Sequence, residues 1–197
     1  ETHLCMLVDE SQIKWQQFIS GDDDSFSWIY TTYARKLYRY GLCFTSNEEV
    51  VRDSIQDIFV YLYDNRTKLE FCDNIKYYLF GAFKNNLIKA IHKESVSEDL
   101  VGDMPFLIEL TVEDQYIQNE QYVTESKKIE KLLSLLTSRQ REIIYYRFTQ
   151  GMSMEEICGL MDLNYQSAQN LIQRSLKKMR TSQIDMDLFL ILLLALQ

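Results

Sequence analysis

The stretch Ser153–Arg180 reads SMEEICGLMDLNYQSAQNLIQRSLKKMR and predicts two helices joined by a tight turn. Its first four residues form a capping box, in which a hydroxyl and a carboxylate satisfy backbone N–H groups at a helix start. Ile157, Leu160 and Met161 follow at helical spacing, and a second apolar stripe begins at Ala168. Because Cys158 and Ala168 are small, the two helices can approach closely. The pattern predicts a helix-turn-helix.

The outer face of the second predicted helix is polar and carries no acidic residue. Amide side chains can pair with adenine in a major groove, and Arg or Lys can pair with guanine or phosphate. The alternative interpretation is a helical hairpin whose polar face is only solvated. The residues on this face are Gln166, Gln169, Asn170, Gln173, Arg174, Lys177 and Lys178.

Composition favours an all-α protein, and the length allows one large domain or two small helical domains. The 197 residues include one proline and six glycines, which is few helix breakers for this length. The four cysteines lie far apart and there are two histidines, so we expect neither a metal site nor disulfides, and no cofactor. The apolar run Leu188–Leu196 is about half the length of a membrane-spanning helix. We expect a cytoplasmic protein without an integral membrane span.

Charge divides the chain more clearly than hydrophobicity does. Residues 94–125 contain nine acidic residues and neither Lys nor Arg, whereas residues 74–93 contain four lysines and no acid. The net charge of −8 is therefore an average, and it does not exclude a nucleic-acid partner. Before the acidic stretch begins at residue 94, we predict helices over residues 10–19, 24–42, 47–65 and 74–93. Further along the chain we predict helices near 113–136 and over 138–149. The predicted domains are residues 1–93 and 113–182, with an acidic linker at 94–112 and an apolar tail at 183–197.

Two regions together resemble the sigma factors of bacterial RNA polymerase. Residues 132–180, from LLSLLTSRQREII to SLKKMR, resemble sigma-70 region 4, with Thr137 where proline is common and Cys158 where alanine is usual. NEEVVRDSIQDIFVYLYDN (47–65) and NIKYYLFGAFKNNLIKAIHK (74–93) resemble the polymerase-docking and promoter-melting helices of region 2. The match is closest to the small two-domain extracytoplasmic-function (ECF) group, and the apolar tail is similar to tails of members from Bacteroides-type bacteria.

The resemblance implies a non-catalytic specificity subunit that binds core RNA polymerase and promoter DNA, with an anti-sigma factor as a further partner. Region 4 would read the minus 35 element, through Gln166, Ser167, Gln169, Asn170, Gln173, Arg174, Lys177 and Lys178. Region 2 would act at the minus 10 element, through Arg66, Lys76, Tyr77, Tyr78, Lys84, Asn85, Asn86, Lys89 and Lys93. Polymerase docking would use Asp53, Gln56, Asp57 and Phe59.

Two other functions compete with this interpretation. A two-domain helix-turn-helix regulator would bind its promoter without polymerase, and an all-helical adaptor would bind proteins only. An enzyme is the weakest alternative, because the sequence has neither a Gly-rich phosphate loop nor metal-ligand spacing. The apolar tail would pack on region 4, bind an anti-sigma partner or bind the polymerase.

Overall fold

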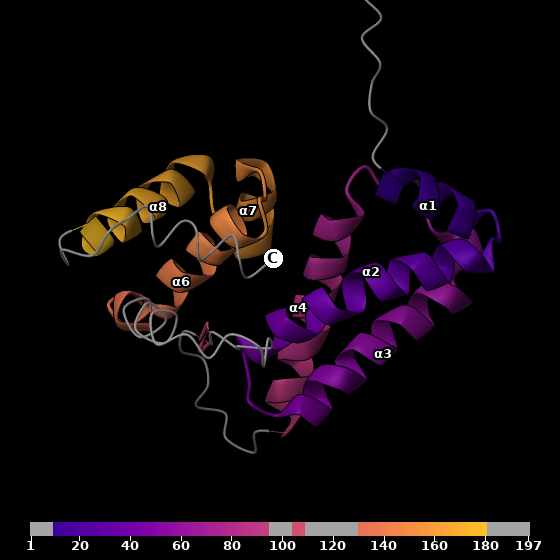
Figure 1. Cartoon of the computed structure of the whole chain (residues 1–197), viewed down its shortest axis with the longest axis horizontal. Coiled ribbons are helices and arrows are strands. Elements are labelled where there is room, and N and C mark those ends of the chain that lie inside the picture. The colour runs from indigo at the N-terminus through magenta and orange to yellow at the C-terminus, as the bar shows by residue number, and fades with distance from the viewer. Residues whose placement is uncertain (1–9, 95–103, 109–129, 181–197) are drawn as a thin grey trace, which may run out of the picture. The chain divides into compact units, whose positions relative to one another are not determined.

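A computed structural model describes residues 10–94, 104–108 and 130–180 of the chain (Figure 1). The described residues form helices, turns and connecting segments, in agreement with the predicted all-α class. The chain divides into two compact units, Glu1–Glu98 and Asp99–Gln197, and this division falls inside the predicted linker. The predicted tail and most of the predicted helix near 113–136 lie outside the described residues.

The N-terminal unit is built from α1 (Glu10–Ile19), α2 (Asp23–Leu42), α3 (Glu48–Asp64) and α4 (Ile75–Glu94). A short 3-10 turn, η1 (Arg66–Lys68), follows α3. All four predicted helices are confirmed, and their ends agree to within one residue. Packing partners are α1 with α2, α2 with α3, and α3 with α4 (Figure 1).

Side-chain caps explain where two of these helices begin. The Asp22 carboxylate accepts a hydrogen bond from the backbone N–H of Ser25 at the start of α2. The Asn47 side chain accepts bonds from the N–H groups of Glu49 and Val50 at the start of α3. Both caps satisfy amide groups that have no partner within the helix. Acidic residues in both first turns also favour the positive end of the helix dipole.

The core of the N-terminal unit is rich in aromatic residues. Trp15, Phe18, Tyr40, Phe80 and Phe83 are almost completely buried. The Trp15 indole donates a hydrogen bond to the Glu70 carbonyl at 3.1 Å, which ties the loop after α3 to α1. Phe80 and Phe83 place the inner face of α4 in this core, where the helix packs against α3, α2 and α1.

The C-terminal unit contains α6 (Ser138–Ile144), the π-helical turn η2 (Tyr145–Thr149), α7 (Met154–Met161) and α8 (Tyr165–Arg180). Residues 130–134 before α6 are also helical. The prediction of one helix over 138–149 is partly wrong, because the α-helix ends at Ile144 and continues as a wider π turn. The capping box predicted at Ser153 and Glu156 is confirmed at the start of α7, and the sequence TSRQ (137–140) forms a second capping box at the start of α6, with Thr137 and Gln140.

Part of the predicted linker packs onto the C-terminal unit. Phe106 is 1% exposed, and its ring lies edge-on to Tyr145 with 5.5 Å between the ring centroids. Ile108 is also buried. Phe106 and Ile108 therefore belong to a core rather than to a solvated segment, whereas residues 94–112 were predicted to be a linker throughout.

No helix within the described ranges is long and apolar enough to cross a membrane. Among the same residues, His, Cys, Asp and Glu side chains form no cluster of three that could bind a metal ion.

Candidate nucleic-acid interface

The helix-turn-helix is held by capping at its turn and by small or apolar side chains at its crossing. Asp162 ends α7 in the left-handed conformation, with a φ of 51°. The Asn164 side chain then accepts a hydrogen bond from the Ser167 N–H at 2.8 Å, which starts α8. Ala168 is fully buried, where α8 packs against α7. The cap and the small residue fix both the start and the inner face of α8.

One face of α8 is buried and the opposite face is exposed. Ser175 and Met179 are buried along with Ala168, whereas the predicted inward residues Leu171 and Ile172 are half-buried. The exposed members of the predicted minus 35 set are Gln166, Ser167, Gln169, Gln173, Arg174, Lys177 and Lys178, and Asn170 is half-buried. The structure therefore brings this set together on the solvent side of one helix.

Three members of this set, Gln166, Asn170 and Lys178, already have side-chain partners within the protein. The Gln166 amide nitrogen donates to the Asn170 side-chain oxygen at 3.2 Å, one turn further along α8. The Lys178 ammonium donates to the Gln140 side-chain oxygen at 3.2 Å and to the Leu135 carbonyl at 3.4 Å. Lys178 therefore ties α8 to the start of α6, a structural contact that the sequence analysis did not predict.

The predicted minus 10 residues are less uniform. Asn85, Lys89 and Lys93 are exposed on α4, whereas Lys76, Tyr77, Tyr78, Lys84 and Asn86 are half-buried. The Asn86 amide donates to the Ser54 carbonyl of α3 at 3.4 Å, so part of its side chain serves the packing of the two helices. The set does not form one continuous exposed stripe.

Arg66 and Tyr78 are held by contacts inside the N-terminal unit. The Arg66 guanidinium lies 2.8 Å from the Asp23 carboxylate and 5.1 Å from the centre of the Tyr63 ring. The Tyr78 ring lies edge-on to Trp15 at 5.6 Å, and burial raises the pKa of its hydroxyl. A tyrosine hydroxyl is already neutral at physiological pH, and the raised pKa leaves that of Tyr78 as a hydrogen-bond donor there.

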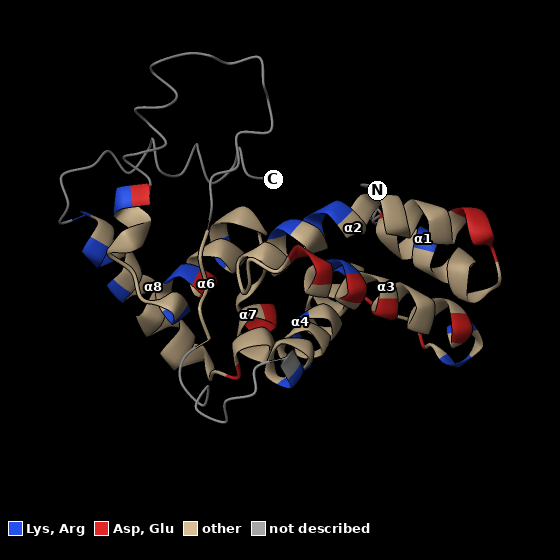
Figure 2. Ribbon diagram, turned by 90° about the horizontal axis from the view of Figure 1, so that it is seen from below, with Lys and Arg blue, Asp and Glu red and all other residues tan. Residues whose placement is uncertain are grey.

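The predicted docking residues lie on α3. Asp53, Gln56 and Asp57 are exposed, and Figure 2 shows acidic positions along this helix. Phe59 is only 3% exposed, so most of its ring belongs to the core. Three polar side chains from the predicted set are therefore available to a protein partner.

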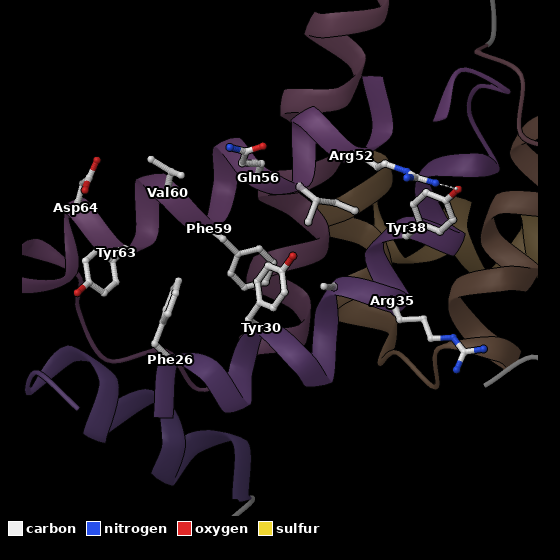
Figure 3. Close-up of a pocket in the computed structure, with 12 residues that line it drawn as sticks. Phe26, Tyr30, Arg35, Tyr38, Arg52, Gln56, Phe59, Val60, Tyr63 and Asp64 are labelled. Carbon is white, nitrogen blue, oxygen red and sulfur yellow. Dashed lines mark hydrogen bonds between the residues drawn. The ribbon is translucent and has the colours of Figure 1, made fainter. Parts of the chain in front are cut away.

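An apolar groove of about 770 Å³ lies between α2 and α3, next to these polar residues (Figure 3). Phe59 and Tyr30 meet in its wall with 4.8 Å between their ring centroids. Arg52, which donates to the Tyr38 hydroxyl, also lines the groove. The sequence analysis missed the α2 side, although the aromatic residues Phe26, Tyr30 and Tyr38 recur there at helical spacing.

Residues 126–179 match the protein family described as Sigma-70, region 4. This range includes α6, η2, α7 and all but the last residue of α8, so the helix-turn-helix is a sigma-70 region 4 domain. Over most of its length the chain is also similar to an ECF sigma factor of RNA polymerase. Proteins of this class are specificity subunits rather than enzymes.

Two kinds of relatives support this assignment. The ECF RNA polymerase sigma factor SigX of Bacillus subtilis (strain 168) is 20% identical over 162 residues, which cover 80% of this chain and 83% of SigX. The solved structure of CnrH, in complex with the cytosolic domain of CnrY, has a TM-score of 0.57 at 18% identity and covers 87% of this chain and 95% of CnrH. RpoE of Bartonella quintana, solved with the anti-sigma factor NepR, has a TM-score of 0.55 at 19% identity, with 79% and 94% covered. At these identities the two structures establish a shared fold.

Proposed function

We propose that this chain binds core RNA polymerase and directs it to promoters, with α8 reading the minus 35 element. The observation that carries the proposal is the exposed polar face of α8 in a region 4 helix-turn-helix. Gln169 and Gln173 lie one turn apart on this face and can pair with base edges, while Arg174 and Lys177 can bind phosphates. Phosphate contacts would fix the register of the helix, and base edges would supply the sequence preference.

The N-terminal unit would act where the promoter strands separate at the minus 10 element. Unstacking a base costs a few kcal/mol, and stacking it on an aromatic face recovers about 1–3 kcal/mol. Tyr77 and Tyr78 are half-buried, so each exposes part of its ring while the rest is anchored. Asn85 and Lys89 are exposed on the same helix and would supply hydrogen bonds and positive charge.

We propose that the exposed polar face of α3 and the adjacent groove form the polymerase-docking surface. The charges of Asp53 and Asp57 would steer the approach of a basic partner surface. The aromatic wall of the groove would supply the apolar contact area in which most binding energy of an interface is concentrated. Because RpoE was co-crystallised with the anti-sigma factor NepR, and CnrH was solved in complex with the cytosolic domain of CnrY, we further propose that an anti-sigma factor regulates this chain in the cytoplasm.

Transcription in vitro with purified core polymerase and a promoter library tests the proposal. The chain should cause transcription from a subset of promoters that share two sequence elements. Gln169→Ala and Gln173→Ala should change the upstream element without changing polymerase binding, while Glu155→Gln on α7 serves as an exposed control.

Transcription that is independent of the chain would contradict the proposal. Tight promoter binding by the chain alone, unaffected by polymerase, would favour a regulator that acts without docking.

A further inference from the structure

The clearest feature that the proposed function does not use is the packing of residues 104–108, here called the strap, onto the C-terminal unit. Burial alternates along it: Phe106 and Ile108 are buried, whereas Leu107 is 50% exposed and Pro105 is also exposed. Alternation of this kind places successive side chains on opposite sides of an extended segment. The strap therefore presents two apolar side chains to the C-terminal unit.

The strap docks on residues that are themselves held in place. Tyr145, which meets Phe106, is 5% exposed, and its hydroxyl accepts a hydrogen bond from the Gln150 amide at 3.0 Å. The neighbouring Tyr146 is fully buried and donates to the Glu142 carboxylate at 2.8 Å. Both tyrosines belong to η2, which leads directly into the helix-turn-helix. The strap is thus attached to a rigid part of the DNA-reading unit.

Docking of the strap shortens the connection between the two units. From Glu94, the end of α4, to Met104 there are ten residue steps, and ten steps span at most about 33–36 Å. If the strap did not dock, Met104 would not be fixed to the C-terminal unit, and the connection would be longer than these ten steps. The effective concentration of one unit near the other falls with about the −3/2 power of tether length, so that adding ten steps to these ten lowers it about threefold.

We propose that the strap, through Phe106, is a spacing-determining element that restricts the promoters on which both units can bind. This inference rests on the proposed function. Each added base pair moves the two promoter elements apart by about 3.4 Å along the duplex axis. A tether with an upper limit of about 36 Å restricts how far the two elements can be moved apart, whereas a longer tether tolerates more added base pairs.

Three variants separate tether length from the stability of the C-terminal unit. Phe106→Ala removes the anchor, and Leu107→Ala is a matched control in the same segment. Insertion of ten Gly and Ser residues between Glu98 and Asp99 lengthens the tether and leaves the strap intact. The insertion keeps the test decisive even if Phe106→Ala impairs folding of the C-terminal unit.

The first measurement is the distance distribution between spin labels at the exposed positions Gln16 and Glu155 in the full chain without DNA. The unmodified chain and Leu107→Ala should share one upper distance limit. Phe106→Ala and the insertion should both extend beyond it. An unchanged upper limit in a folded Phe106→Ala chain would overturn the inference, whatever the chain does in transcription.

The second measurement is transcription from promoters whose two elements are moved apart or together by one and two base pairs. The unmodified chain and Leu107→Ala should show a narrow optimum. Phe106→Ala and the insertion should show a broader profile, and the insertion should reduce activity at the optimum about threefold. The variants could have longer spin-label distances and yet show the same dependence of activity on promoter spacing as the unmodified chain. This result would refute the spacing role and leave the strap with a packing role only. Lack of transcription by the unmodified chain would instead count against the proposed function.

Discussion

The neighbouring lysines at the end of α8 provide a sharp test, because the structure gives them different roles. Lys177 is exposed on the proposed DNA-reading face, whereas Lys178 donates to Gln140 and Leu135. Replacing each lysine by methionine removes the charge and keeps most of the apolar stem. Lys177→Met should weaken promoter binding without affecting stability. Lys178→Met should chiefly affect stability.

The expected magnitudes follow from the two kinds of contact. Loss of one phosphate contact reduces the slope of log K against log salt by about 0.9. Between 50 and 200 mM salt, this change in slope corresponds to about a 3.5-fold difference in how much the affinity falls. For Lys178, the loss of a partly exposed hydrogen bond costs about 0.5 kcal/mol, near the low end of the usual range. In a unit of fewer than 100 residues this would lower Tm by about 2–4 °C.

Promoter binding by the polymerase complex at several salt concentrations and thermal unfolding of the free chain measure the two effects. Lys177→Met should change the salt slope and leave Tm constant, whereas Lys178→Met should lower Tm and leave the slope nearly constant. Equal salt slopes for Lys177→Met and the unmodified chain would refute the phosphate role of Lys177. An unchanged Tm for Lys178→Met would show that its contacts with α6 contribute nothing.

Three further predictions concern the N-terminal unit. Gly41→Ala should lower the free energy of unfolding by about 1–3 kcal/mol in denaturant titrations, because overpacking strains a close-packed core. The added Cβ would lie 2.6 Å from a Val51 methyl and 2.8 Å from the Phe83 ring, whereas Ser27→Ala at an exposed site of α2 should change little. Asp53→Asn with Asp57→Asn should slow association with core polymerase several-fold at low salt and leave Tm unchanged, and an unaltered association rate would remove these residues from the docking surface. A hydrogen bond from Tyr38, aided by Arg52, holds the pKa of Glu48 below 4.5, so its stabilising effect is present above pH 4.5 and is lost as pH falls through the lowered pKa. The Tm difference between Glu48→Gln and the unmodified chain should therefore shrink on acidification, and a difference that grows would contradict this sign.

Local sequence signals were sufficient to predict most helix starts and much of the core. Capping boxes at Thr137 and Ser153 and the cap at Asn47 depend on residues within one turn, so they are visible in the sequence. The stripe that includes Ile58, Phe59 and Leu62 is buried as its spacing predicts. The exposed side of α8 was predictable for the same reason, because it is the complement of the buried stripe.

The remaining features depend on contacts between residues far apart in the sequence. Phe106 lies in an acidic stretch with weak periodicity, and only the position of Tyr145 makes it a core residue. The contact of Lys178 with Gln140 spans 38 residues, and that of Arg66 with Asp23 spans 43. The α2–α3 groove likewise depends on how two helices pack, which the spacing within either helix does not determine. The spacing of residues within one helix therefore predicted which faces are polar. It did not predict which polar side chains bond to residues far away in the sequence.

The charge distribution links the two proposed binding surfaces. A chain with a net charge of −8 repels DNA at long range, and few cations lie on the exposed side of α8. The α8 surface alone is therefore expected to bind DNA weakly. The acidic side chains of α3, in contrast, favour docking on a basic protein surface. Docking would raise the local concentration of α8 near the promoter, and the second contact would then form within one complex. In this scheme weak DNA binding by the free chain is an advantage, because the free chain does not occupy promoters before it has bound polymerase. The strap then determines which promoter spacings the polymerase-bound chain accepts.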